Sequence, residues 1–285
     1  MKEECVDCFL KQAERICNKF SIKKEIKDKI NYQFLQSLNN SNNIIAPEIS
    51  RILNILIKEN IGIDDLYKEE KTFYNKLLLN HENKLRDIIK NSKDPFITAL
   101  KLSIAGNLID FGPLHEFDII EFIKKVNFLN FDIDNSLILK NYLTKSKKLL
   151  YLGDNAGEIV LDKLFIETIK SLYPEIFITF AVRGDYILND VTIEDAEYVN
   201  LNNLVNVIDN GYDAPSTILE KCSDEFKNTF NTSDIVISKG QGNFEGLLNN
   251  KEKDIFFLLM IKCNVISNYI GKQKNSIIVL HNKNI

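Results

Sequence analysis

The chain is poor in histidine and cysteine, and both shortages limit its chemistry. Its three histidines, His81, His115 and His281, lie outside the polar loops described below, so histidine-based phosphoryl chemistry is not expected. The five cysteines are an odd number, and the N-terminus lacks the apolar core of a secretory signal. A disulfide framework is therefore not expected. Together these features predict a cytoplasmic protein.

Long hydrophobic runs and a strong net charge are also missing. The longest apolar run, residues 255–261, is far too short to span a membrane and fits a buried strand. The formal net charge of -4 creates no strong field for nucleic acid or an anionic membrane, so neither is an expected partner. With 45% hydrophobic residues, the chain has enough apolar side chains for a real core.

The first half of the sequence has helical periodicity. Val6, Phe9, Ala13 and Ile16 recur at spacings of three and four, and similar patterns continue beyond residue 100. Pro47 suits the first turn of one of these helices. We therefore predict that residues 1–147 form an all-helical domain.

The second half has a different period. Six short runs rich in β-forming residues alternate mostly with helical segments, at residues 149–152, 176–182, 204–208, 234–238, 255–261 and 277–280. Strands that alternate with helices indicate right-handed crossovers and a mostly parallel sheet. Residues 148–285 are therefore predicted to form an α/β sandwich of about six strands.

Three polar loops follow strands of this predicted sheet, at residues 153–158, 183–190 and 238–245. Loops at the carboxyl ends of parallel strands meet at one edge of the sheet, where such folds bind ligands. Asp154, Asn155 and Asp190 offer two carboxylates and an amide oxygen, which suit magnesium or manganese better than zinc. The alternative is that both aspartates only cap helices.

The third loop has the composition of an anion site. Gly240 allows the backbone to approach a ligand, Lys239 offers a positive charge and Asn243 an amide. Arg183 is a second candidate cation for the same phosphate. A glycine-rich turn without an anion, and an arginine in an ordinary ion pair, are the alternatives.

Two further motifs lie in the helical half. Gly106 interrupts a helical pattern, which indicates close packing there, and Asn107 and Asp110 share a face that would line the site. The alternative is a helix terminus. Cys5 and Cys8 share a face of the first helix and are either core residues or a metal or redox pair.

The order of these motifs resembles the damage-control phosphatases, the family known as domain of unknown function 89, and most closely its compact prokaryotic and archaeal branch. The resemblance covers nearly the whole chain. It rests on Cys5-x-x-Cys8, Ala46-Pro47-Glu48, Gly106-Asn107-x-Ile109-Asp110, residues 153–158, Asn189-Asp190-Val191-Thr192, Gly211-Tyr212-Asp213-Ala214-Pro215, residues 238–245 and Lys262-Cys263.

The resemblance implies a helical domain joined to a Rossmann-like αβα domain, and metal-dependent hydrolysis of phosphate monoesters of small metabolites, such as damaged or side-product sugar or cofactor phosphates. It implies a divalent ion (manganese, magnesium, cobalt or nickel) on Asp154, Asn155 and Asp190, and a phosphate contact from Lys239. The nucleophile is either metal-activated water, with Glu158 as the base, or the Asp154 carboxylate. Asn189 is a further candidate catalytic residue.

Two other classes of function stay open on the sequence. An S-adenosylmethionine-dependent methyltransferase also places a glycine-rich loop after its first strand, although Asn155 and Ala156 stand where glycines would be expected. A non-catalytic protein that binds a metal or a phosphorylated metabolite would use the same cleft.

Overall fold

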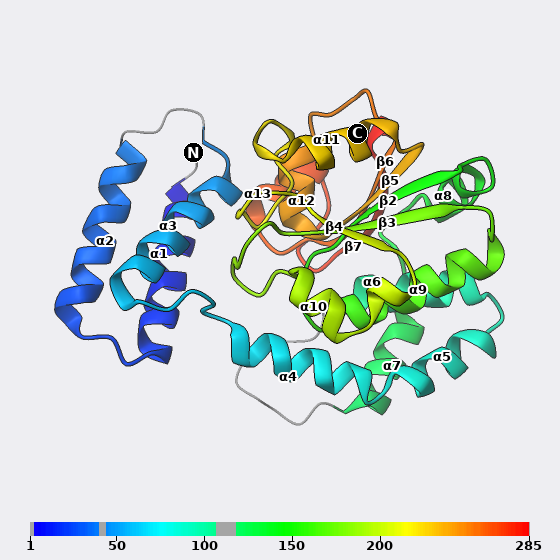
Figure 1. The fold of residues 1–285 in the computed structure, drawn as a ribbon, viewed down its shortest axis with the longest axis horizontal. Helices are drawn as coiled ribbons and strands as arrows, with labels where there is room; N and C mark the ends of the chain where they lie inside the picture. The colour runs from blue at the N-terminus through cyan, green and yellow to red at the C-terminus, as the bar shows by residue number, and fades with distance from the viewer. Residues whose placement is uncertain (1–2, 40–43, 107–117, 285) are drawn as a thin grey trace.

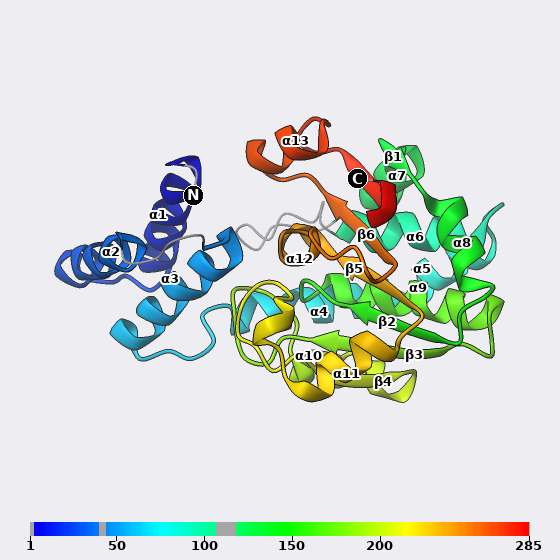
Figure 2. The ribbon, with the colours of Figure 1, turned by 90° about the horizontal axis from the view of Figure 1, so that it is seen from above.

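The computed structural model describes residues 3–39, 44–106 and 118–284. The chain forms a twisted sheet with helices on both faces, and a group of three helices, α1 to α3, stands to one side of it (Figures 1 and 2). Asn107 and Asp110 lie outside the described residues. None of the described helices has both the length and the apolar character needed to cross a membrane.

The sheet has seven strands in the order β1-β7-β6-β5-β2-β3-β4, and only the β6–β7 pair is antiparallel. The strands are β1 (Ile133–Asp134), β2 (Lys148–Leu152), β3 (Phe177–Val182), β4 (Asn206–Asp209), β5 (Ile235–Lys239), β6 (Ile255–Met260) and β7 (Ile277–His281). The six predicted runs correspond to β2 through β7, so the predicted α/β fold with a mostly parallel sheet is confirmed. The two-residue β1 is too short to show a period.

The chain direction across the sheet reverses beside β2. From β2 the chain moves outward to β3 and β4, and it then returns to place β5 on the other side of β2. The carboxyl ends of β2 and β5 therefore flank a topological switch point, where open α/β sheets form their ligand crevice. The loop at residues 153–158 follows β2, and helix α12 follows β5.

The helices fall into three groups. The separate group comprises α1 (Glu3–Lys19), α2 (Lys24–Asn39) and α3 (Ala46–Ile61). The second comprises α4 (Lys68–Leu79), α5 (Glu82–Lys90), α6 (Pro95–Ala105), α7 (Ile119–Phe128), α8 (Ser136–Leu143), α9 (Glu158–Leu172) and α10 (Ile193–Tyr198). The third comprises α11 (Asp224–Thr232), α12 (Gly240–Leu247) and α13 (Asn264–Ile270). Pro47 lies in the first turn of α3, as its position in the sequence indicated.

The hydrophobic cores do not divide the chain at residue 147. One core joins Tyr151 and Phe180 of the sheet to helices α4 through α9, and Phe96 of α6 meets Phe165 of α9 with ring centroids 5.3 Å apart. A second core covers the opposite face of the sheet. Only α1 to α3 have a separate core, which extends to Tyr67. The helical half is thus divided near residue 67: residues before it pack in the separate core, and helices from α4 onward pack in the core of the sheet. The apolar α6 is buried in that core.

The separate core of α1 to α3 leads to a test of local stability. Phe34 is fully buried in this core, whereas Tyr32 on the same helix is 66% exposed. We expect Phe34→Ala to lower the free energy of unfolding of this helical group by about 3–5 kcal/mol, and Tyr32→Ala to change it little. Hydrogen exchange should show lost protection in residues 3–61 while β2 and β5 stay protected. Equal loss of protection in both regions would contradict the separation of the cores.

Candidate active site

The loop after β2 begins with a glycine because the Phe180 ring packs against this backbone. The Gly153 amide donates to the Ala181 carbonyl at 2.9 Å, and a Cβ atom on Gly153 would lie 2.6 Å from the Phe180 ring. The chain then places Asp154 and Asn155 at the edge of the sheet, where they are 7% and 6% exposed. The Asn155 Nδ2 donates to Asp154 Oδ2 at 2.7 Å. This hydrogen bond uses the amide nitrogen of Asn155 and leaves its amide oxygen available to bind another group.

The loop after β3 pairs with the loop after β2 through main-chain hydrogen bonds. The Val191 amide donates to the Asp154 carbonyl, and the Ala156 amide donates to the Asn189 carbonyl, both at 2.9 Å. Asn155 and Asp190 form an isolated antiparallel bridge between the loops. The structure thus brings together the three residues that the sequence suggested as metal ligands.

Arg183 lies behind this pair of loops and is only 2% exposed. Its Nε donates to Asp190 Oδ2 at 2.7 Å, its Nη1 donates to Asn243 Oδ1 at 2.9 Å, and its Nη2 lies 3.9 Å from Asp154 Oδ1 without a hydrogen-bond partner. Burial raises the pKa of Asp190 to about 7; the Arg183 charge opposes the rise and the Asp154 charge adds to it. Arg183 therefore orients and stabilises the carboxylates from below.

Lys239 ends β5 with a completely buried side chain. Its ammonium contacts Glu158 Oε1 at 2.5 Å, Asp162 Oδ1 at 2.6 Å and the Ser103 carbonyl at 2.8 Å. An ammonium has three donors, and these three partners use them all. Lys239 is therefore a buried ion-pair residue here, rather than the phosphate contact that the sequence suggested.

Glu158 is the partner through which Lys239 acts on the site. Its Oε2 accepts from Asn155 Nδ2 at 3.1 Å, and a Cβ atom on Gly106 would lie 2.6 Å from its side chain. The close packing predicted at Gly106 is thus present, and its neighbour is Glu158. Burial raises the pKa of Glu158 to about 7, with Lys239 opposing the rise. Because Glu158 is fully buried and does not line the cleft, its position differs from that predicted for a catalytic base.

The structure explains why a glycine stands at position 240, and the neighbour that approaches it is a side chain of the protein. Its φ is +80°, and a Cβ atom there would lie 2.1 Å from Asp154 Oδ2. Glycine is needed because the Asp154 carboxylate packs against this backbone. Asn243 is fully buried and donates to the carbonyls of Gly153 and Lys239. Both residues therefore join the loops after β2 and β5 and lie behind the cleft surface.

Asn75 on α4 was not predicted from the sequence, yet it joins the loop after β2 to the first turn of α10. Its side chain is 1% exposed; Oδ1 accepts from the Gly157 amide at 2.6 Å and Nδ2 donates to Asp195 Oδ1 at 2.9 Å. Asp195 in turn caps α10 by accepting from the amide and hydroxyl of Thr192, each at 2.9 Å. A lone asparagine on a helix carries no sequence signal for this role.

A cleft of about 1090 Å³ opens above the paired loops. Its walls come from α1 and α3 on one side and from α12 and α13 on the other, and these helices face each other in Figure 2. Asp154, Asn155, Asn189 and Asp190 line it, and so do Leu188, Gln241, Glu245 and Lys262, which the sequence did not single out as site residues. Arg183, Lys239, Gly240, Asn243 and Glu158 are not among its lining residues.

Cys5 and Cys8 line this cleft, and neither forms a disulfide with another described cysteine. Within the described parts of the chain, no three or more His, Cys, Asp or Glu side chains are grouped to hold a metal ion. Asp154 and Asp190 supply two carboxylates, and the amide oxygen of Asn155 could serve as a third protein ligand if a metal binds here. This all-oxygen set fits magnesium or manganese, which keep several water ligands.

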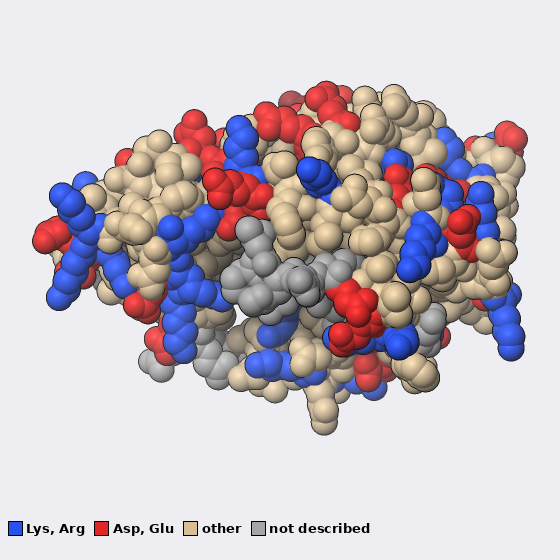
Figure 3. All heavy atoms as spheres, turned by 90° about the horizontal axis from the view of Figure 1, so that it is seen from below, with Lys and Arg blue, Asp and Glu red and all other residues tan. Residues whose placement is uncertain are grey.

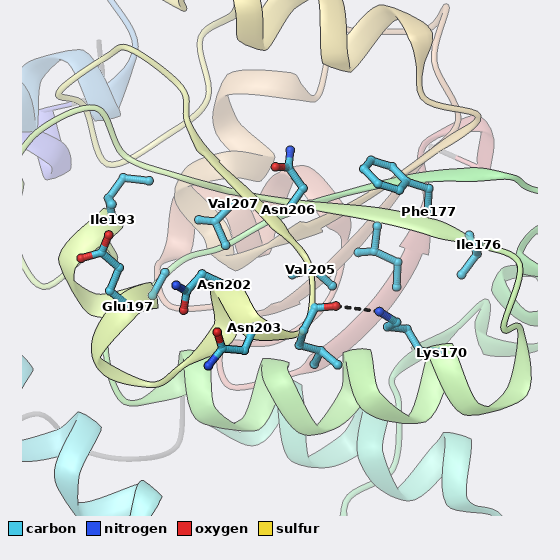
Figure 4. Close-up of a pocket in the computed structure, with 13 residues that line it drawn as sticks. Lys170, Ile176, Phe177, Ile193, Glu197, Asn202, Asn203, Val205, Asn206 and Val207 are labelled. Atoms are coloured by element: carbon cyan, nitrogen blue, oxygen red, sulfur yellow. Dashed lines mark hydrogen bonds between the residues drawn. The ribbon is translucent and has the colours of Figure 1, made fainter.

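A second hollow, of about 490 Å³, lies beside the first residues of β3 and β4 (Figure 4). Lys170 lies at one side of it and donates to the Leu204 carbonyl at 2.6 Å. None of the predicted site residues lines it. On the molecular face in Figure 3, Lys and Arg side chains are interspersed with Asp and Glu side chains, as expected for a net charge of -4.

Comparisons with known proteins identify similar chains of nearly the same length. An uncharacterized protein of Methanocaldococcus jannaschii is 31% identical over 95% of this chain and 92% of its own length. A damage-control phosphatase of Pyrococcus horikoshii is 33% identical, covering 98% of this chain and 97% of its own. The crystal structure of a protein of the domain of unknown function 89 family, also from Pyrococcus horikoshii, superposes with a TM-score of 0.89, 30% identity and 99% coverage of both chains.

The family model of the damage-control phosphatase ARMT1-like domain matches residues 1–278, nearly the full length of the chain. A match over nearly the whole chain shows that it belongs to the damage-control phosphatase ARMT1-like family.

Proposed function

We propose that this protein is a divalent-metal-dependent phosphatase that hydrolyses phosphate monoesters of small metabolites. The observation that carries the proposal is the bridge between Asn155 and Asp190, which gathers three oxygen ligands with Asp154 at the floor of a large cleft. Relatives named damage-control phosphatase support the type of reaction.

The metal would be held by Asp154, Asn155 and Asp190. A bound divalent cation supplies a Lewis acid that polarises the phosphoryl group and lowers the pKa of water. The surrounding residues orient the ligands: Arg183 holds the Asp190 carboxylate, and Glu158 accepts a hydrogen bond from the Asn155 amide. Such supporting contacts keep ligand side chains in one orientation.

Lys262 is our candidate for the phosphate contact in place of Lys239. It lines the cleft with an exposed side chain, and its charge, together with that of Arg183, opposes the burial-driven rise in the pKa of Asp190. The hydrogen bond from the Lys262 amide to Gln241 Oε1, at 2.9 Å, fixes its backbone beside the start of α12. A lysine in this position can neutralise charge on the phosphoryl group.

The methyltransferase alternative is less well supported by the loop after β2. The Ala156 and Gly157 amides, which would face a ligand in a glycine-rich loop, donate to the Asn189 carbonyl and to Asn75 Oδ1. The non-catalytic alternative shares the cleft and differs only in the absence of turnover.

Metal dependence is tested by chelation. Exhaustive removal of divalent ions should abolish hydrolysis of a generic phosphate monoester, and manganese, magnesium, cobalt or nickel should restore it. Asp190→Ala should lower manganese affinity and turnover at least tenfold, because a carboxylate ligand is lost. Asp185→Asn is the matched control, since Asp185 is exposed on the same loop. Full activity after chelation would disprove the metal requirement.

The phosphate contact is tested by inhibition with inorganic phosphate. A charge-assisted contact contributes about 1.5–3 kcal/mol, so Lys262→Ala should weaken inhibition roughly tenfold or more. Lys274→Ala is the control, because Lys274 is an exposed lysine of the same cleft. Manganese affinity should stay near wild type in both variants. Equal inhibition of both variants and wild type would show that Lys262 does not contact the phosphate.

Lys239 should behave as a structural residue. Lys239→Met leaves Glu158 and Asp162 buried without their cation. We therefore expect the free energy of unfolding to fall by about 3–5 kcal/mol. Lys262→Met should leave stability unchanged, because its side chain is exposed. Chemical denaturation measures both effects. A Lys239→Met protein as stable as wild type would show that the buried ion pairs do not stabilise the fold.

A further inference from the structure

Leu188 has a backbone conformation that is unusual for its residue type. Its φ is +47°, in the left-handed region that bulky side chains rarely adopt. The Asp190 amide donates to the Ile187 carbonyl at 3.1 Å, which closes a turn with Leu188 as its second residue. Turns with a positive φ at this position strongly favour glycine.

Residues on both sides of Leu188 are held by hydrogen bonds to other segments. The Asn189 carbonyl accepts from the Ala156 amide at 2.9 Å, and the Tyr186 carbonyl accepts from Lys58 Nζ of α3 at 3.0 Å. Arg183 holds the Asp190 side chain at the other end. Backbone strain persists where neighbouring contacts determine the conformation, and such strain gathers at ligand sites.

The shape of the turn explains why φ is positive but does not explain a leucine. Glycine or asparagine would adopt the same backbone at lower cost. Leu188 is half-buried and lines the same cleft as the proposed metal ligands Asp154, Asn155 and Asp190.

The rest of the cleft extends this apolar surface. Ile45 and Pro47 of the α3 wall, and Val265 and Tyr269 of α13, line it, and most of its lining is apolar. Tyr269 is 51% exposed. At about 1090 Å³ the cleft is far larger than a phosphate group and has room for the whole alcohol portion of an ester.

We infer that Leu188 is a specificity residue, and that the preferred substrates are phosphate monoesters whose alcohol carries an apolar group close to the phosphate. The inference rests on the proposed phosphatase function. An apolar alcohol buries its surface against Leu188, whereas a hydroxyl group placed against this side chain gives up hydrogen bonds to water and gains none from the leucine. Leu188 touches the alcohol and takes no part in bond cleavage.

Two five-carbon substrates test this inference: n-pentyl phosphate and ribitol 5-phosphate, assayed with manganese. Wild type should have the higher kcat/KM for n-pentyl phosphate. In Leu188→Gly and Leu188→Asn the ratio of the two kcat/KM values should fall roughly tenfold, because apolar contact is lost. Leu188→Met should keep most of the preference. Comparing ratios between variants cancels the difference in leaving-group chemistry.

Two other measurements separate specificity from folding and from catalysis. The melting temperature of Leu188→Gly and Leu188→Asn should be equal to or above that of wild type, and their manganese affinity should be unchanged. Calorimetry with n-pentylphosphonate, which cannot be hydrolysed, should show binding about tenfold weaker in Leu188→Gly than in wild type.

Failure of the inference and failure of the proposed function give different results. If wild type hydrolyses neither these esters nor a generic phosphate monoester with any divalent metal, the proposed function fails, and phosphonate binding alone decides the role of Leu188. A wild-type preference for ribitol 5-phosphate, an unchanged ratio in Leu188→Gly, or equal phosphonate binding by that variant and wild type would each overturn the inference. In that case Leu188 would only occupy the turn.

Discussion

The site depends on one short stretch of main-chain pairing. Because Val191 donates to Asp154 and Ala156 donates to Asn189, the loops after β2 and β3 run side by side for a few residues beyond the sheet. Without this pairing, two carboxylates at neighbouring strand ends would repel each other and move towards solvent. With it, Asp154 and Asp190 stay close at less than 10% exposure.

Keeping these carboxylates together requires buried cations behind them. Arg183 contacts Asp190 from below, and Lys239 neutralises Glu158 and Asp162 under the start of α9. Buried charges of this kind add little net stability compared with apolar residues, but they are costly to leave unpaired. Their role here is to fix orientation: Lys239 holds Glu158, and Glu158 accepts from the Asn155 amide.

The sequence predicted the fold better than it predicted the site. Strands β2 to β7 were recognisable because each is a short apolar run ending in polar or glycine residues, whereas β1 has only two residues. The hydrophobic cores do not follow the predicted boundary at residue 147, because helical periodicity shows that a helix has an apolar face but not what covers it. Helices α4 to α9 turned out to share the core of the sheet.

At the site, the sequence identified which loops meet but not which way their side chains point. Lys239 and Arg183 stand on the right loops, yet both turn into the protein, while Lys262 stays exposed in the cleft. Burial and ion pairing decide this, and neither can be read from residue type. Asn75 shows the same limit, because its contacts with Gly157 and Asp195 join segments far apart in the chain.

The most direct test of the account is the position of a bound metal. A crystal soaked in manganese should show an anomalous scattering peak within bonding distance of oxygen atoms of Asp154, Asn155 and Asp190. Vanadate added to such a crystal should lie between that peak and Lys262. A manganese peak elsewhere, or none when activity requires the metal, would contradict the central claim that the paired loops form the catalytic centre.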